Sequence, residues 1–194
     1  MTLKKQVGET VTIVSVSDVS ALYAVSIATA HAWRRPRGVT MQEQPRVYTR
    51  AKGSASILGE RLAHVSSTDV YDLDQVIANV RRELGREPQP AVDRRLRDTA
   101  TVPTSIRVGG LKVPLVLAGL AEVGFVLGID KRVVAVMDGR GLLPAPVALV
   151  GSAGTPTKVY AAWQFQGDAR YSQERVEALA RLHRYGVADA VSER

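Results

Sequence analysis

Hydrophobic residues recur at helical spacing in two well-separated stretches of the chain. In the first, Val19, Leu22 and Tyr23 follow the i, i+3, i+4 spacing of a helix with one apolar face. The apolar residues of 121–127 do the same in the second stretch. A short turn and then a residue suited to cap a second helix, Ser26 or Asp130, follow each stretch. The pattern predicts two helix-turn-helix elements.

The two stretches also align with each other as an internal repeat. Residues 16–33 match residues 120–137 without a gap at an offset of 104, so that Asp18 meets Glu122. The Val-Tyr pairs that follow match at the shorter offset of 89. Repeats are sought first because missing one leads to a wrong fold. In this chain the repeat predicts two copies of one unit, with a longer β segment in the first copy.

Further elements are predicted around the two copies. The β-branched residues 10–16 suggest a short strand. Residues 73–84 have the pattern of a helix with one apolar stripe, and Asp72 is its expected N-cap. Residues 91–98 suggest a short basic helix. Residues 172–186 have the pattern of a capped amphipathic helix.

We therefore expect a mainly α protein with small β wings, built from two tandem winged helix-turn-helix domains. The N-terminal domain, with an enlarged wing region, would span residues 1–84. The C-terminal domain, with a closing helix, would span residues 112–194. Residues 85–111 contain prolines and hydroxyl residues and are predicted to be a linker with the short basic helix.

Charge favours a phosphate-bearing partner. The 194-residue chain has a net charge of +7, and the segment from His31 to Arg61 alone holds seven Lys or Arg against two Glu. The chain has no cysteine, which excludes disulfides and thiolate metal sites. Its longest apolar stretch, 113–121, is too short to span a bilayer. We expect a cytoplasmic, nucleoid-associated protein without a membrane partner.

The outer face of the second helix of such an element fits a major groove about 12 Å wide. Helical spacing puts particular side chains on these outer faces. In the first copy they are Ile27, Ala28, His31, Arg34 and Arg35, and in the second they are Lys131, Arg132, Ala135 and Asp138. Lys131 and Arg132 lie in the first helical turn, where the backbone amides also favour a phosphate.

Residues 120–165 resemble the excisionase and MerR-like winged helix-turn-helix family of actinobacteria and their phages and plasmids. The most specific part of the match is LLPAPVALV at 142–150, and residues 15–35 with 69–78 resemble the same pattern. The resemblance implies that the start of the recognition helix and the wing contact DNA. The residues that it assigns to DNA are Lys131, Arg132, Lys158, Thr29, His31, Arg34 and Arg35.

The candidate set is completed by Arg37, Arg50 and Lys52 of the basic segment and by Arg140 at the end of the second recognition helix. One departure from the family concerns Ile27 and Ala28, which stand where the family has a polar or basic residue. The first copy would then bind through its backbone and basic loop, or it would dock a partner.

Nothing in the sequence predicts an enzyme. We find no nucleophile and base arrangement, no metal-ligand spacing among His31, His64 and His183, and no phosphate-cradling glycine loop, so no metal or cofactor is expected. The predicted function is sequence-selective binding of double-stranded DNA, in transcription control or as an excision, partition or replication-control factor of a mobile element. The alternative is a phage or plasmid interaction or assembly component that reuses the fold. A homodimer or higher assembly on DNA is left open.

Overall fold

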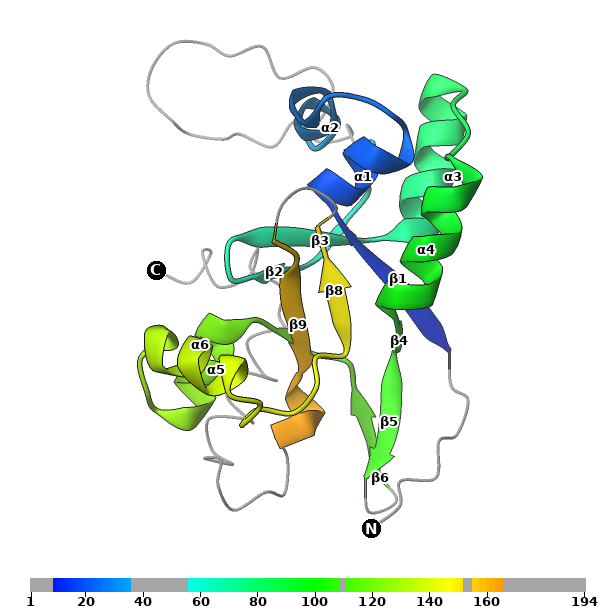
Figure 1. Ribbon diagram of the computed structural model, residues 1–194. Coiled ribbons are helices and arrows are strands. Elements are labelled where there is room, and N and C mark those ends of the chain that lie inside the picture. Colours follow the sequence, from blue (N-terminus) through cyan, green and yellow to red (C-terminus); the bar gives the residue numbers. More distant parts are fainter. Residues whose placement is uncertain (1–8, 36–55, 109–110, 152–154, 166–194) are drawn as a thin grey trace, which may run out of the picture.

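The computed structural model describes residues 9–35, 56–108, 111–151 and 155–165. The N-terminal part is a β-α-α-β-β unit (Figure 1). Its elements are β1 (Thr10–Ser15), α1 (Val16–Leu22), α2 (Ile27–Trp33), β2 (Arg61–Val65) and β3 (Thr68–Asp72). The strand predicted over 10–16 is therefore confirmed as β1. Helix α1 begins directly after it, because the Ser15 hydroxyl accepts from the Asp18 N–H at 3.3 Å and caps the helix.

The middle of the chain contributes two helices and three strands. They are α3 (Leu73–Leu84), α4 (Pro90–Ala100), β4 (Thr101–Pro103), β5 (Ser105–Val108) and β6 (Leu111–Pro114). Asp72 caps α3, as the sequence predicts. Strand β4 pairs with β1, and β5 pairs with β6 in a separate two-stranded sheet. The residues expected to form a linker, 85–111, therefore include α4, β4 and β5, and they join the N-terminal unit by strand pairing.

The C-terminal part repeats the order of elements of the N-terminal unit. It consists of β7 (Leu117–Ala118), α5 (Leu120–Leu127), α6 (Lys131–Gly139), β8 (Ala148–Val150), β9 (Thr157–Ala161) and a 3-10 helix η1 (Ala162–Phe165). In both units the second strand of the hairpin (β3 or β9) lies between the first strand of the hairpin (β2 or β8) and the strand that opens the unit (β1 or β7). The sheet orders are β2-β3-β1-β4 and β7-β9-β8, and all pairs are antiparallel.

The two units contact each other reciprocally. Near the start of α1, the Asp18 carboxylate accepts a hydrogen bond from the N–H of Gly151, which follows β8 in the other unit, at 2.8 Å. Gly119, the N-cap of α5, packs in turn against Ser66 in the turn of the β2–β3 hairpin. The hydroxyls of Thr68 and Thr157, 89 residues apart, lie 3.3 Å from each other between the two hairpins. Such an exchange of contacts is the pattern of a two-fold relation between two copies.

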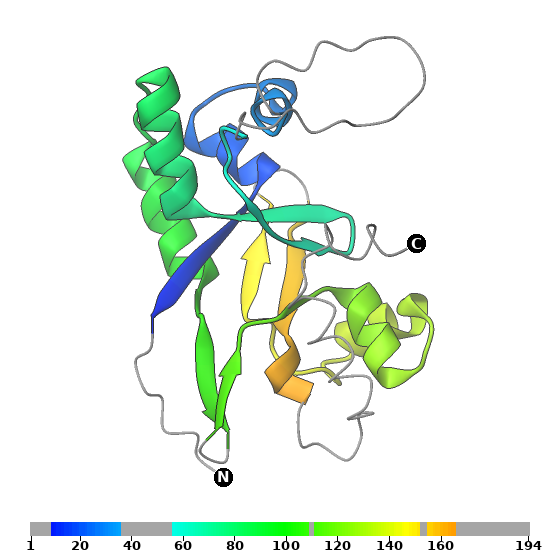
Figure 2. The same cartoon turned by 180° about the vertical axis from the view of Figure 1, so that it is seen from behind.

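Among the described residues, three hydrophobic clusters hold the structure together. One lies under α1, α2 and α3, and another lies under α5 and α6. The third is built from both units, because Ile13 and Val70 of the first pack with Val150 and Val159 of the second. Helix α4 packs against both β1 and β8, and it stands beside α3 along one flank of the molecule (Figures 1 and 2).

The predicted fold class is wrong. The protein is not a mainly α protein of two tandem winged helix-turn-helix domains with small wings, but a mixed α/β structure. Its described residues form sheets of four, two and three strands, and strands of both units share one core cluster. The sequence pattern misled because residues 99–105, which are rich in Thr and contain a Pro, have the composition of a loop. Their pairing with β1 is a long-range contact that local composition does not report.

Candidate nucleic-acid interface

Helix α2 turns one face to the core and the opposite face to solvent. Ser26 caps it, because its hydroxyl oxygen accepts from the Thr29 N–H at 3.0 Å. Ala30 and Trp33 are buried, and the Trp33 ring packs edge-on against Tyr23 with centroids 5.6 Å apart. Of the predicted DNA-binding residues, the hydroxyl of Thr29 is bonded to that of Ser26 at 2.8 Å as part of the cap.

The outer face of α2 is mixed in character. Ile27, Ala28 and His31 are exposed on the helix, and Arg34 and Arg35 are exposed where it ends. The prediction that His31 lies on the surface of this helix is confirmed. The basic side chains therefore gather toward the C-terminal end of α2, next to the β2–β3 hairpin.

Arg34 reaches from the end of α2 to this hairpin and forms part of a basic cluster. We call Asp69, Arg34, Arg61 and His64 the Asp69 cluster. Arg34 Nη1 donates to Asp69 Oδ2 at 2.7 Å, and Arg61 Nη1 donates to Asp69 Oδ1 at 2.9 Å. His64 Nδ1 lies 2.7 Å from the same Oδ1. Two guanidinium groups and an imidazole thus share a single carboxylate, so the cluster has a positive surplus.

The environment of Asp69 favours its charged form. The Asp69 side chain is only 8% exposed, whereas its three partners are exposed. Burial alone would raise the pKa of Asp69, but hydrogen bonds from His64 and Arg61 and the charges of Arg61 and Arg34 hold the pKa below its ordinary value. The carboxylate therefore fixes the positions of basic side chains that remain open to solvent.

Replacing Asp69 by asparagine is expected to lower stability at neutral pH and to have little effect in acid. Because the folded-state pKa of Asp69 lies below its unfolded value of about 3.9, its carboxylate stabilises the fold above that pH. This contribution is lost as the pH falls through the folded-state pKa. Urea unfolding of Asp69→Asn and wild type at pH 7 and at acid pH measures the difference, and an equal gap at both pH values would contradict the prediction.

Helix α6 is the counterpart of α2 in the second unit. Asp130 caps it, as predicted, by accepting from the Arg132 N–H at 2.7 Å. Val134 is fully buried and holds the inner face of the helix in the core. Lys131 and Arg132 are exposed in the first turn, and Arg140 is exposed at the C-terminal cap. The basic residues predicted on this helix therefore all face solvent.

Lys158 has a partner within the protein. Its Nζ donates to Asp138 Oδ2 at 2.6 Å, and the Tyr160 hydroxyl donates to Asp138 Oδ1 at 2.7 Å. Burial alone would raise the pKa of Asp138, but the bonds from Lys158 and Tyr160 and the charge of Lys158 hold this pKa below its ordinary value. Lys158 thus links strand β9 to α6. The ammonium group predicted to contact DNA forms an ion pair within the protein instead.

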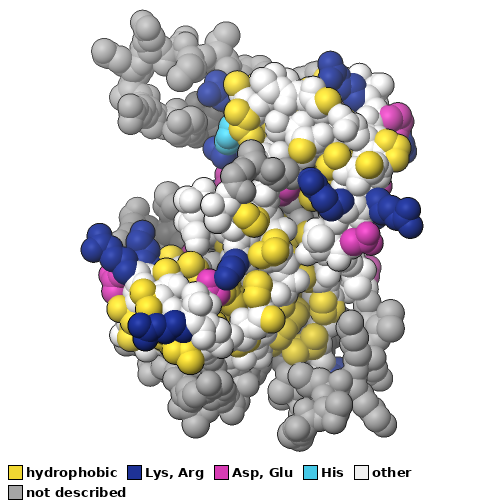
Figure 3. All heavy atoms as spheres, in the orientation of Figure 1, with side chains coloured by type: hydrophobic (Ala, Val, Ile, Leu, Met, Phe, Trp, Pro, Cys, Tyr) yellow, Lys and Arg dark blue, Asp and Glu magenta, His cyan; other side chains and the backbone are white. Residues whose placement is uncertain are grey.

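The predicted site residues fall into two groups in space. Thr29, His31, Arg34 and Arg35 lie on or beside α2, and Lys131, Arg132, Arg140 and Lys158 lie on or beside α6. In Figure 1, α2 lies above the β2–β3 hairpin and α6 lies below it. Lys and Arg side chains are visible over both helices (Figure 3). Arg37, Arg50 and Lys52 lie outside the described residues, as does the helix predicted over 172–186.

Sequence reasoning missed Arg61, His64 and Asp69 as members of the site. His64 and Asp69 are paired across the β2–β3 hairpin. Its two-residue turn is Ser66-Ser67, in which Ser66 has a φ of 58°. Two-residue hairpin turns are usually recognised in a sequence by Asn-Gly or Asp-Gly, and this turn contains neither. The sequence signal that could have predicted the ion pair is the placement of basic and acidic residues on either side of a Ser-Ser turn.

On the opposite flank, three arginines of α3 and α4 are paired with carboxylates. On α3, Arg81 pairs with Glu87 and Arg82 pairs with Glu83 at 2.9 Å. Arg97 of α4 contacts two carboxylates, those of Asp74 at 2.6 Å and Asp93 at 3.1 Å. Arg94 and Arg95 of α4 are also exposed, so the difference from the Asp69 cluster lies in the pairing of Arg81, Arg82 and Arg97 and not in the total charge.

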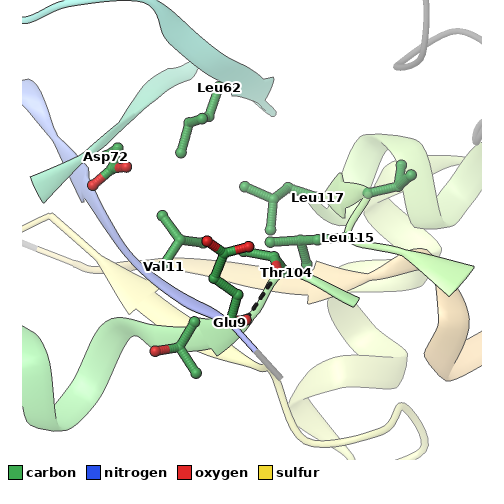
Figure 4. A pocket seen from close by; sticks show the side chains of 9 residues that line it. Glu9, Val11, Leu62, Asp72, Thr104, Leu115 and Leu117 are labelled. Atoms are coloured by element: carbon green, nitrogen blue, oxygen red, sulfur yellow. Dashed lines mark hydrogen bonds between the residues drawn. The ribbon is translucent and has the colours of Figure 1, made fainter. Parts of the chain in front are cut away.

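A hollow between β1, β2 and β7 is the other candidate site (Figure 4). Leu62, Leu115 and Leu117 supply apolar walls, and Glu9 and Asp72 supply carboxylates. The Thr104 hydroxyl donates to the Glu9 carbonyl at 2.9 Å. The lining residues include no cationic side chain, so this hollow is unsuited to a phosphate. Among the described residues, no group of three or more His, Cys, Asp or Glu is placed to hold a metal.

No protein-family model, curated protein or solved structure matches the chain. No helix in the described part of the chain combines the length and the apolar character needed to cross a membrane.

Proposed function

We propose that the protein binds double-stranded DNA through the outer faces of α2 and α6 and through the Asp69 cluster. The observation that carries the proposal is the convergence of Arg34, Arg61 and His64 on one carboxylate, which leaves a fixed positive surplus beside an exposed helix. Each guanidinium has five N–H donors, and these two arginines are exposed, so further donors remain for phosphate oxygens.

Helix α6 supports the same proposal from the other unit. Lys131 and Arg132 are exposed at its start and Arg140 is exposed at its end. Phosphate contacts position a protein on DNA, whereas contacts to base edges give selectivity. The resemblance of residues 120–165 to excisionase and MerR-like proteins favours a role in transcription control or in mobile-element excision, partition or replication control. Such a protein would work on the nucleoid.

A salt titration of duplex binding tests the proposal. The affinity of the protein for a 30-base-pair duplex of mixed sequence is measured by fluorescence anisotropy between low and high salt. We expect the logarithm of the association constant to fall linearly with the logarithm of salt, by about 0.9 per phosphate contact. Lys131→Ala with Arg132→Ala, and separately Arg35→Ala with Arg61→Ala, should each reduce that slope by about 2 and weaken binding about tenfold.

The matched control is Arg81→Ala with Arg82→Ala on α3. It removes the same charge, but each of these arginines has a carboxylate of its own, Glu87 or Glu83, whereas Arg61 shares Asp69 with Arg34. This variant should retain the wild-type slope. Absence of duplex binding at low salt, or equal slopes for all three double variants, would overturn the proposal.

A further inference from the structure

The outer face of α6 carries two exposed valines. Val133 is 49% and Val136 is 53% exposed, and they lie one helical turn apart. Val134, between them in sequence, is fully buried, so the two exposed valines face away from the core. We call Val133 and Val136, with Arg132 and Arg140, the α6 face.

Basic residues bracket these valines on the same helix. Arg132 precedes them in the first turn, and Arg140 follows them at the cap. Hydrophobic and Lys or Arg side chains lie side by side over the α5–α6 pair in Figure 3. Helix α2 repeats the arrangement, since Ile27 and Ala28 are exposed near its start and Arg35 is exposed after its end. The positive charge makes a polyanion the complementary partner for both faces.

Resting on the proposed DNA binding, we infer that the α6 face selects duplexes that carry methyl groups in the major groove, and thus A·T-rich sites read through thymine. Valine has no hydrogen-bonding group, and the apolar feature of the major groove is the thymine C5-methyl. Against a G·C pair, the valines would cover polar base edges without satisfying them, which costs binding energy. Val133 and Val136 are then the specificity residues, and Arg132 and Arg140 hold the flanking phosphates.

Four DNA hairpin duplexes, arranged as two pairs, test this inference. Their stems are alternating dA-dT, alternating dA-dU, alternating dG-dC and alternating dG-dC with 5-methylcytosine. The members of each pair differ by the C5-methyl alone. We expect the methylated member of both pairs to bind more tightly, by about fourfold for each methyl group contacted, which corresponds to about 0.8 kcal/mol.

Val133→Ser with Val136→Ser should abolish the methyl preference and retain the salt slope. Both positions are exposed, so the variant is expected to fold, and circular dichroism checks this. The matched control is Leu62→Ser, an exposed apolar residue on β2 whose side chain points toward the hollow in Figure 4. It should keep the wild-type methyl preference.

Each outcome separates this inference from the proposal on which it rests. Equal binding of the methylated and unmethylated duplexes, with a normal salt slope, would overturn methyl reading and leave DNA binding intact. Absence of binding to all four duplexes would overturn both. If sedimentation shows that the wild type self-associates and the double valine variant does not, while their methyl preferences are equal, the α6 face is a protein interface and the inference fails.

Discussion

Replacing Asp18 by alanine is expected to lower the free energy of unfolding by about 3 kcal/mol. Asp18 is 2% exposed. Its Oδ2 accepts from the Ser15 N–H at 2.9 Å, the Ser15 hydroxyl at 2.7 Å and the Gly151 N–H at 2.8 Å. Alanine would leave these donors without their acceptor in a site that water does not reach readily. The substitution removes the Asp18 side-chain half of the capping box of α1 and a bond between the two units at once.

Urea unfolding monitored by circular dichroism measures this effect. Asp98→Ala removes an exposed carboxylate of α4 and should change the free energy of unfolding by less than about 0.5 kcal/mol. Asp18→Asn retains an acceptor oxygen but no charge, so its cost should lie between these two. If Asp18→Ala and Asp98→Ala cost the same, the bond to Gly151 does not join the units.

Replacing Gly119 by alanine should cost about 2 kcal/mol, because the site has no room for a side chain. A Cβ at this position would lie 2.2 Å from the Ser66 hydroxyl oxygen, 2.9 Å from Val65 Cγ1 and 3.0 Å from the Ser66 backbone nitrogen. The hydroxyl can rotate away, but the backbone of the hairpin turn cannot do so without moving β2. The effect is therefore steric and acts between α5 and the other unit.

Gly139→Ala is the matched control for this prediction. No heavy atom lies within 4 Å of a Cβ placed at Gly139, the last residue of α6. Alanine favours the helix over glycine, so this variant should gain about 0.5 kcal/mol. Opposite signs for the two substitutions in thermal or urea unfolding are the expected result. A loss of similar size in both would show that the contact of Gly119 with Ser66 is not the cause.

The local elements of this chain could be predicted because their signals are local. Ser26, Asp72 and Asp130 cap the helices for which they were proposed, and the β-branched residues from Thr10 form β1. The offset of 104 between the copies corresponds to equivalent positions, since Asp18 and Glu122 each close the first turn of their helix by accepting from a backbone N–H.

The arrangement of the sheets could not be predicted because it depends on partners far apart in the chain. Composition marks Thr101 as part of a loop, yet it pairs with Thr12 across the sheet. Part of the candidate site was missed for the same reason, as Asp69 gathers Arg34 from a helix and Arg61 from a neighbouring strand. Helical spacing correctly placed Lys131 and Arg132 on the surface, but it wrongly placed Asp138 there, since the Asp138 side chain is only 14% exposed and holds Lys158.

The reciprocal contacts of Asp18 with Gly151 and of Gly119 with Ser66 join two copies within a single polypeptide. When such partners are separate subunits, dilution dissociates them. Here the covalent connection keeps their effective concentration constant, so pairing is independent of how much protein is present. Because the halves share one chain, they need not be identical, as the different ion pairs at Asp69 and Asp138 illustrate.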